Sequence, residues 1–328
     1  MNNIMRFKNT YLILILSLIS SLQSSHKAYG QGADFSPEKV EFNIKIKGFE
    51  FQYNIMSIFV LPEEKLEINI TSALLADLYT IESTDINLNR IDSLKWGFTS
   101  PGGKGHYRIS MIQAEPADTA VMNLFVMIPF EELKGEHLNN YRIGKYPSIP
   151  LKRLPIYKPP RGFVEVTQEN QDVYLTPHFK LRQFLCKQES GFPKYVVLRE
   201  RLLLKLELIL EKVNEKGYRC DTFNILSGYR TPFYNHQIGN VKYSRHLWGG
   251  AADIFIDEEP VDDMMDDLNK DSIINWKDAA ILYDIIDDMY GHKFYEPFLG
   301  GLARYKKTTS HGPFVHVDVR GKRARWGY

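Results

Sequence analysis

The spacing of hydrophobic residues changes its period about halfway along this chain of 328 residues. Over residues 40–130, apolar and polar residues alternate in short segments such as 40–46 and 65–70, and turn residues separate them. The segments 107–112 and 120–128 show the same alternation. Because successive side chains of a β-strand point to opposite faces, this pattern is typical of half-buried strands. We therefore expect the first half to fold as a small β-sandwich.

The second half carries the spacing of a helix and several further strands. Five apolar residues recur at every third or fourth position before Gly217 and predict a buried helical stripe: Leu198, Leu202, Leu206, Ile209 and Val213. The other predicted elements are strands at 222–226, 252–256 and 314–319, a short helix that Thr231 caps and Pro232 begins, and a helix at 276–289. Since helices and strands do not alternate regularly, we expect an α+β fold with a small antiparallel sheet and flanking helices.

Five prolines within fourteen positions separate the two halves: Pro147, Pro150, Pro155, Pro159 and Pro160. Such a stretch suits a stiff, extended connector better than a helix or a central strand. The sequence therefore predicts four parts, namely a signal peptide over residues 1–30, a β-rich accessory domain over 31–145, a proline-rich connector over 146–164 and a second domain over 165–328. The sequence of the accessory domain shows no catalytic constellation, and we expect this domain to serve in binding, in positioning or in stability.

The first thirty residues have the order of a secretory signal. Arg6 and Lys8 precede an apolar run from Tyr11 to Leu22, and small residues follow up to Gly30. The run has about twelve residues, whereas a bilayer-spanning helix needs about twenty. We therefore expect cleavage near Gly30, export to the periplasm and no stable membrane anchor afterwards, with secretion to the medium as the open alternative.

The charge balance excludes one class of partner. The chain has 41 basic and 40 acidic side chains, with a formal net charge of +1. Sequence-independent binding to phosphates would need a basic surplus, so we expect no nucleic-acid partner. At 44% hydrophobic and 25% charged residues, the chain is also too apolar to be disordered throughout.

The two cysteines, Cys186 and Cys220, leave two readings open. In an exported protein they can form a disulfide. They can equally be separate buried thiols that pack as small apolar side chains. With one cysteine on each side of the intervening segment, neither a CxxC redox motif nor a thiolate zinc site is expected.

One group of residues has the chemistry of a metal site. Asp253 follows His246 after six intervening residues, and Gly249 and Gly250 between them permit a tight reversal of the chain. His316 lies in a predicted strand, with its side chain on the face opposite the flanking valines. Imidazole nitrogens and carboxylate oxygens are ligands that zinc accepts.

The segments around these residues resemble a known family. They are 227–232, 244–254 and 314–320, together with Asn235. Their amino-acid sequences are similar to those of the zinc peptidases of the D-alanyl-D-alanine carboxypeptidase and murein endopeptidase group, and the resemblance covers roughly Ser190 to the C-terminus. The resemblance implies a zinc peptidase domain in which His246, Asp253 and His316 bind Zn²⁺ and water takes the fourth position. It also implies peptidoglycan stem peptides as substrates.

The same resemblance suggests which residues take part in catalysis. Arg230 stands where the family carries an arginine that contacts the substrate carboxylate or the developing oxyanion. Three residues before the last ligand, where the family usually has Glu or Asp, this chain has Pro313. Some members instead use a histidine five residues before that ligand, which here is His311, and histidine suits proton transfer near neutral pH. Asp318 is the second candidate, although it is equally suited to orienting His316.

Two charged segments and one tryptophan complete the predictions. Residues 257–288 hold twelve acidic side chains and lack the order of a calcium loop, so we expect a solvated acidic segment. The chain from Leu302 onward is rich in Lys and Arg, which could face an acidic substrate or that acidic segment. Trp248 is expected in the core.

The predicted function is an exported zinc peptidase acting on stem peptides, as a D,D-carboxypeptidase or cross-link endopeptidase. The alternative, prompted by Pro313, is a non-catalytic zinc-stabilised module that binds the cell wall.

Overall fold

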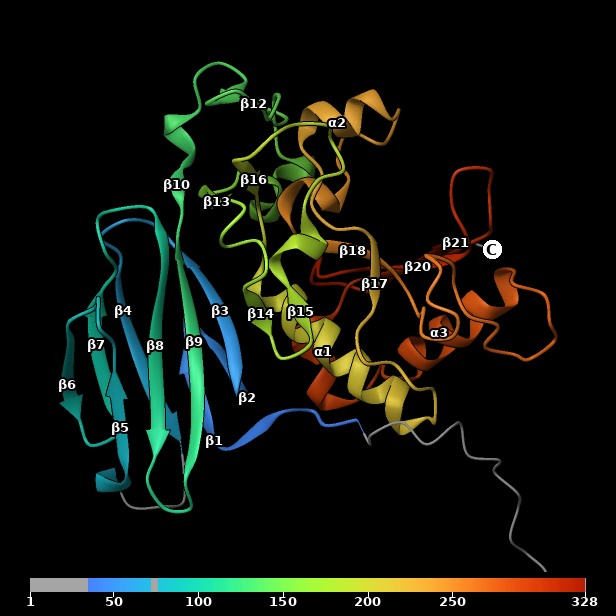
Figure 1. Ribbon diagram of the computed structural model, residues 1–328. Helices are drawn as coiled ribbons and strands as arrows, with labels where there is room; N and C mark the ends of the chain where they lie inside the picture. The colour runs from blue at the N-terminus through green and yellow to red at the C-terminus, as the bar shows by residue number, and fades with distance from the viewer. Residues whose placement is uncertain (1–34, 72–75, 328) are drawn as a thin grey trace, which may run out of the picture. The chain divides into compact units, whose positions relative to one another are not determined.

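The computed structural model describes residues 35–71 and 76–327 (Figure 1). The predicted signal peptide, residues 1–30, lies outside the described residues. Within those two ranges, no helix is both long enough and apolar enough to cross a membrane.

The first half forms two β-sheets. One has the strand order β2-β1-β4-β7-β6 and the other the order β3-β9-β8-β5. The strands are β1 (Lys39–Ile46), β2 (Phe49–Tyr53), β3 (Ile55–Val60), β4 (Lys65–Thr71), β5 (Tyr79–Glu82), β6 (Leu88–Asp92), β7 (Lys95–Thr99), β8 (Gly105–Gln113) and β9 (Asp118–Val126), and a 3₁₀ turn at Ala76–Leu78 precedes β5. The strands β1, β4, β8 and β9 match the segments that the alternating pattern predicts. The ring of Phe42 in β1 packs on that of Tyr79 in β5, with centroids 5.4 Å apart, so apolar side chains of the two sheets meet.

Short elements surround the proline-rich segment. They are β10 (Ile128–Pro129), β11 (His137–Leu138), β12 (Tyr141–Arg142), β13 (Gly162–Val166), β14 (Tyr174–Thr176), β15 (Phe179–Lys180), β16 (Lys194–Val196), and 3₁₀ turns at Phe130–Glu132, Leu151–Arg153, Pro155–Tyr157 and Leu181–Phe184. A three-stranded sheet of order β10-β13-β16 joins a strand before the prolines to two strands at and after their end. One cluster of buried apolar residues runs from Val40 to Val319. The predicted boundaries at 145 and 164 stay predictions.

The second half is a mixed α+β region, as the sequence predicts. Its sheet has the order β17-β18-β20-β19-β21. The strands are β17 (Asn224–Ser227), β18 (Ala251–Phe255), β19 (Gly301–Tyr305), β20 (Phe314–Asp318) and β21 (Ala324–Gly327); the helices are α1 (Glu200–Glu215), α2 (Pro232–Gln237) and α3 (Trp276–Asp288), with 3₁₀ turns at Arg245–Trp248 and Lys293–Phe298. All neighbouring strands are antiparallel except β19 and β21.

Local signals in the sequence explain where the helices begin and end. The stripe predicted for α1 is buried. After α1, Gly217 adopts φ +84°, a left-handed conformation that favours glycine and ends the helix. The hydroxyl of Thr231 accepts a hydrogen bond from the Tyr234 amide at 3.0 Å and caps α2, whose first residue is Pro232. These predicted signals are confirmed.

Helix α1 also contacts the first half of the chain through acidic side chains. The Lys47 ammonium lies 2.7 Å from the Glu200 carboxylate, and the Tyr53 hydroxyl donates to Glu211 at 2.7 Å. The fully buried Glu207 lies 2.7 Å from His178, whose other ring nitrogen donates to the Ser36 carbonyl in the first half at 3.0 Å. The helix that supports the C-terminal sheet is thus tied to the strands of the first half.

Three side chains that the sequence singled out are buried. Cys186 and Cys220 are both free and buried, so the structure has separate thiols and no disulfide between them. Trp248 is fully buried, as expected for a core residue. Its indole N–H donates to the Lys158 carbonyl at 2.8 Å, which satisfies the polar end of the ring.

Candidate metal centre

Strand pairing brings two of the three predicted ligands together. In the antiparallel register of β18 and β20, Asp253 lies directly opposite His316. Residues opposite each other in a sheet project their side chains from the same face. Register is set by long-range pairing, so residues 63 positions apart in the chain become neighbours.

A tight reversal before β18 positions the third ligand. His246 lies in the 3₁₀ turn Arg245–Trp248, which ends at Gly249 with φ +59°. A Cβ atom at Gly249 would lie 2.1 Å from the Val197 carbonyl oxygen, so the position needs glycine for both its conformation and its space. The predicted role of this glycine in turning the chain is confirmed.

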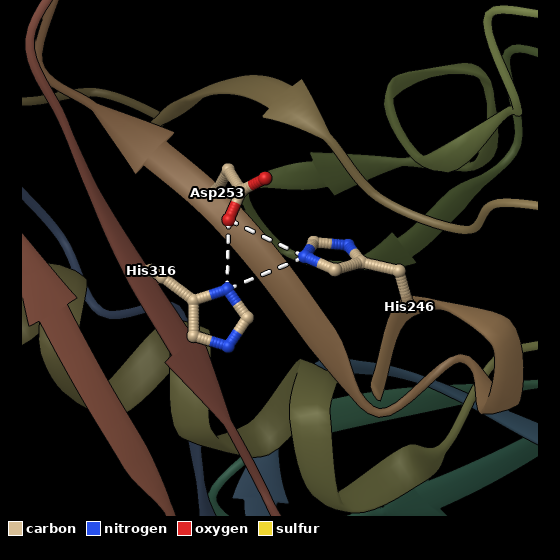
Figure 2. A group of neighbouring side chains, drawn as sticks. All are labelled: His246, Asp253 and His316. Atoms are coloured by element: carbon tan, nitrogen blue, oxygen red, sulfur yellow. Dashed lines mark hydrogen bonds and ion pairs between the residues drawn. The ribbon is translucent and has the colours of Figure 1, made fainter. Parts of the chain in front are cut away.

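The three side chains point toward one another, and their donor atoms form a small triangle (Figure 2). His246 Nε2 lies 3.3 Å from Asp253 Oδ1 and 3.3 Å from His316 Nδ1. His316 Nδ1 lies 2.8 Å from Asp253 Oδ1. Ligand atoms about 2.05 Å from a tetrahedral zinc ion are about 3.3 Å apart. Two edges of the triangle match this spacing and the third, at 2.8 Å, is shorter, so the triangle is close in size to one face of a zinc coordination tetrahedron.

Neighbouring groups fix the orientation of both imidazole rings. His246 Nδ1 donates to the Gly228 carbonyl at 2.7 Å, which leaves the Nε2 lone pair directed at the centre. His316 Nε2 lies 3.3 Å from Asp318 Oδ2, which leaves Nδ1 facing the centre. Partners of this kind set the tautomer and orientation of metal-binding histidines.

The electrostatics of the triangle favour a cation at its centre. Burial alone would raise the pKa of Asp253, but His246 and His316 outweigh it and hold that pKa well below its ordinary value. Burial lowers the pKa of His316, but its hydrogen bonds to Asp253 and Asp318 outweigh this and raise it. Lone pairs of three atoms converge on one buried point, so either a proton or a metal ion must lie between them.

Arg230 holds the oxygen of Asp253 that faces away from the triangle. Its Nη2 donates to Asp253 Oδ2 at 2.6 Å, and its Nε donates to Ser227 Oγ at 2.7 Å. Oδ1 is thereby left to face the two histidines. Arg230 is therefore a half-buried partner of a predicted ligand as well as a positive charge beside it.

A pocket of about 850 Å³ opens over the triangle. Its lining contains His246, Asp253 and His316, and also Arg230 and His311. Five of the six predicted site residues therefore line this pocket, and the sixth, Asp318, lies behind His316. A site with three protein ligands that faces a pocket has the arrangement of catalytic zinc sites, since structural sites are closed by a fourth.

The two candidates for proton transfer occupy different environments. His311 Nδ1 donates to the Gly312 carbonyl at 2.7 Å, so the neutral ring presents an unprotonated Nε2. Asp318 is fully buried and accepts from the Gly301 amide at 2.8 Å and from the Arg320 amide and Nε at 3.0 Å and 2.9 Å. Its oxygens are occupied by donors, which suits orientation of His316 better than proton transfer.

Some contributors to this site carry no assigned role in the sequence analysis. Ser227 and the Gly228 carbonyl orient Arg230 and His246. Arg320 grips the carboxylate of Asp318. All three residues lie inside the segments that resemble the peptidase family, so this resemblance was the one sequence signal that could have pointed to them.

The basic C-terminal residues find partners inside the chain. Arg325 lies 2.6 Å and Arg323 3.4 Å from the carboxylate of Asp287 in α3. Earlier in the acidic segment, Asp257 accepts hydrogen bonds from the amides of Asp262 and Asp263, both at 3.0 Å. The basic C-terminal residues were expected to face either an acidic substrate or the acidic segment, and Arg323 and Arg325 pair with the acidic segment.

A buried His-Asp-His triangle beneath an open pocket, on an α+β scaffold, is the arrangement of a mononuclear metallohydrolase. Residues 177–273 match the family model described as Peptidase M15, a family of metal-dependent peptidases, so the chain carries an M15-like peptidase domain. This segment includes His246 and Asp253, and His316 follows it in the chain. No curated protein and no solved structure matches the chain.

Proposed function

We propose that the chain is an exported zinc-dependent peptidase that hydrolyses peptidoglycan stem peptides, as a D,D-carboxypeptidase or as an endopeptidase that cuts cross-links. One observation carries the proposal: the donor atoms of His246, Asp253 and His316 are spaced close to three tetrahedral zinc ligands, and the three residues line an open pocket.

Each residue of the pocket has a task in this chemistry. A zinc ion held by the three ligands supplies Lewis acidity and lowers the pKa of water toward neutrality. His311 accepts a proton at Nε2 when water attacks the scissile carbonyl and returns it to the leaving amine. Arg230 keeps Asp253 in place and offers its remaining N–H groups to negative charge on the substrate.

Location and substrate are consistent with each other in this proposal. The basic, apolar and small residues that precede position 31 supply the export signal. An exported enzyme reaches peptidoglycan, and stem peptides carry carboxylates that suit a pocket containing Arg230 and Arg320. We place the mature chain in the periplasm, with release into the medium as the other destination.

The proposal is tested on the purified mature chain and two variants, His246→Ala and His311→Ala. Zinc content is measured by elemental analysis, and cleavage by mass analysis of muropeptide products. We expect about one zinc per chain in the wild type and in His311→Ala, none in His246→Ala, and products from the wild type alone. His137→Ala is the control, because His137 is exposed and outside the pocket.

Other outcomes decide against the proposal in different ways. Zinc without products from any of the proteins would support the alternative of a wall-binding module, which Pro313 at the usual position of the acid favours. Full activity of His311→Ala would move the proton transfer to another group. Absence of zinc from the wild type would remove the metal site.

A further inference from the structure

The proline-rich segment, residues 146–164, packs against the metal centre. Leu151 and Tyr157 of this segment line the pocket over the metal ligands. Tyr157 is buried, and its ring packs edge-on against that of Trp248, with centroids 5.1 Å apart. Trp248 is the last residue of the 3₁₀ turn that carries His246. The segment therefore supplies part of the pocket wall and contacts the turn that positions a predicted ligand.

Groups outside this short turn satisfy its last two carbonyl groups. Carbonyls at the end of a helical turn have no partner within the turn. The Leu247 carbonyl accepts a hydrogen bond from the Tyr146 hydroxyl at 2.9 Å. The Trp248 carbonyl accepts one from Arg199 Nε at 2.9 Å, and Arg199 Nη2 donates at 3.2 Å to the Ile156 carbonyl of the proline-rich segment. Both carbonyls are thus tied to that segment, one directly and one through an arginine.

The contact of Tyr146 is the one next to a predicted ligand, because Leu247 follows His246 directly in the chain. The Tyr146 hydroxyl also lies 3.0 Å from the hydroxyl of Tyr229. A phenol has one hydrogen to donate, and Tyr146 gives its hydrogen to the Leu247 carbonyl, so Tyr229 is the donor in this pair. The ring of Tyr146 packs on that of Trp248, with centroids 6.0 Å apart. Ring and hydroxyl together hold Tyr146 in one orientation against the turn.

The place of the His246 ring depends on two fixed points. One is the hydrogen bond from Nδ1 to the Gly228 carbonyl at 2.7 Å, and the other is the main chain of the turn. Distances between zinc and its ligand atoms vary by only about 0.2 Å from site to site. A small displacement of the turn therefore moves Nε2 out of range of an ion that Asp253 and His316 also bind. The hydrogen bond from Tyr146 opposes that displacement.

We propose that the proline-rich segment belongs to the metal centre, and that Tyr146 is a positioning residue that holds the turn of His246 in place for the ion. This inference rests on the proposed function for the identity of the ion, zinc. Tyr146 contacts neither the ion nor the substrate in this proposal. It acts through the Leu247 carbonyl, so its removal weakens zinc binding while the three ligands remain.

The test compares the zinc affinity of Tyr146→Phe with that of Tyr229→Phe in the mature chain, by competition with a chromophoric chelator. Each variant loses one hydroxyl of the same hydrogen-bonded pair, but only the Tyr146 hydroxyl donates to the turn. We expect zinc to bind about 10-fold more weakly to Tyr146→Phe. This is the low end of the range for residues that orient metal ligands, because Tyr146 acts through the main chain. Tyr229→Phe should bind zinc as tightly as the wild type.

Thermal unfolding of the metal-free proteins separates positioning from stability. Both variants should unfold a few degrees below the wild type, since each removes a hydrogen bond from the pair. Wild-type zinc affinity in Tyr146→Phe, or an equal loss of affinity in both variants, would overturn the positioning role.

Failure of the peptidase proposal looks different. In that case the wild type binds zinc and Tyr146→Phe binds it more weakly, while the zinc-loaded wild type cleaves no muropeptide. A wild type that binds no zinc would overturn both proposals.

Discussion

Replacing Asp318 with asparagine separates its two possible roles. In the structure, Asp318 Oδ1 accepts from the Gly301 amide and from the Arg320 amide, and Oδ2 faces His316 Nε2. In Asp318→Asn, the amide oxygen keeps the two main-chain donors, so the new NH₂ group faces His316 Nε2. Two donors then oppose each other unless His316 shifts its proton to Nδ1. That is the nitrogen that faces the metal centre, so the favoured tautomer can no longer bind the ion.

The expected loss of zinc affinity is about 10- to 100-fold, or about 1.4 to 2.7 kcal/mol, as for other groups that orient metal-binding histidines. Affinity is measured by competition with a chromophoric chelator, and turnover is measured separately at saturating zinc. Asp172→Asn is the control, because it removes the same charge from the surface. Unchanged zinc affinity with turnover lowered by a factor of 100 or more, roughly the contribution of a general base, would refute the orienting role.

Three further predictions concern stability. Gly249→Ala should lower the free energy of unfolding by more than about 3 kcal/mol, because a Cβ atom there meets a backbone carbonyl oxygen at 2.1 Å. Gly239 has a similar φ and open space around it, so Gly239→Ala should cost about 1–2 kcal/mol. Urea denaturation compares the two variants, and equal losses would contradict the steric argument. Burial lowers the pKa of His178, but its bond to a buried glutamate of α1 outweighs this and raises it. The free energy of unfolding should therefore be higher in the wild type than in His178→Gln, with the largest difference below the ordinary histidine pKa. The difference should shrink as pH rises through the raised pKa, and a difference that grows with pH would contradict the prediction. In the wild type, the free energy of unfolding should be about 2.7 kcal/mol higher with zinc at 100 times its dissociation constant than with a chelator. Thermal unfolding measures this difference, and the chelator should have no effect on His246→Ala.

Elements set by local pattern could be predicted from the sequence. The predicted apolar stripe is buried, with Leu198 just before α1 and its other members within α1, and the cap at Thr231 is made. The alternation around His316 placed its side chain opposite the valines of β20. These features depend on residues within a few positions of one another, so periodicity and capping chemistry are sufficient to find them.

Features set by contacts between distant segments could not be derived in the same way. No local pattern shows that Asp253 and His316 occupy opposed positions in neighbouring strands, and the resemblance to a peptidase family alone linked them. The choice between His311 and Asp318 likewise needed the structure, because it depends on which carboxylate oxygens are already occupied.

Zinc titration of the metal-free mature chain tests the central claim most directly. Cleavage of a stem peptide is followed as zinc is added in substoichiometric steps. We predict no cleavage without metal, a linear rise and a plateau at one zinc per chain, because one buried triangle of ligands serves one ion. Cleavage that persists without metal, or zinc binding that saturates while no peptide is cut, would contradict the account.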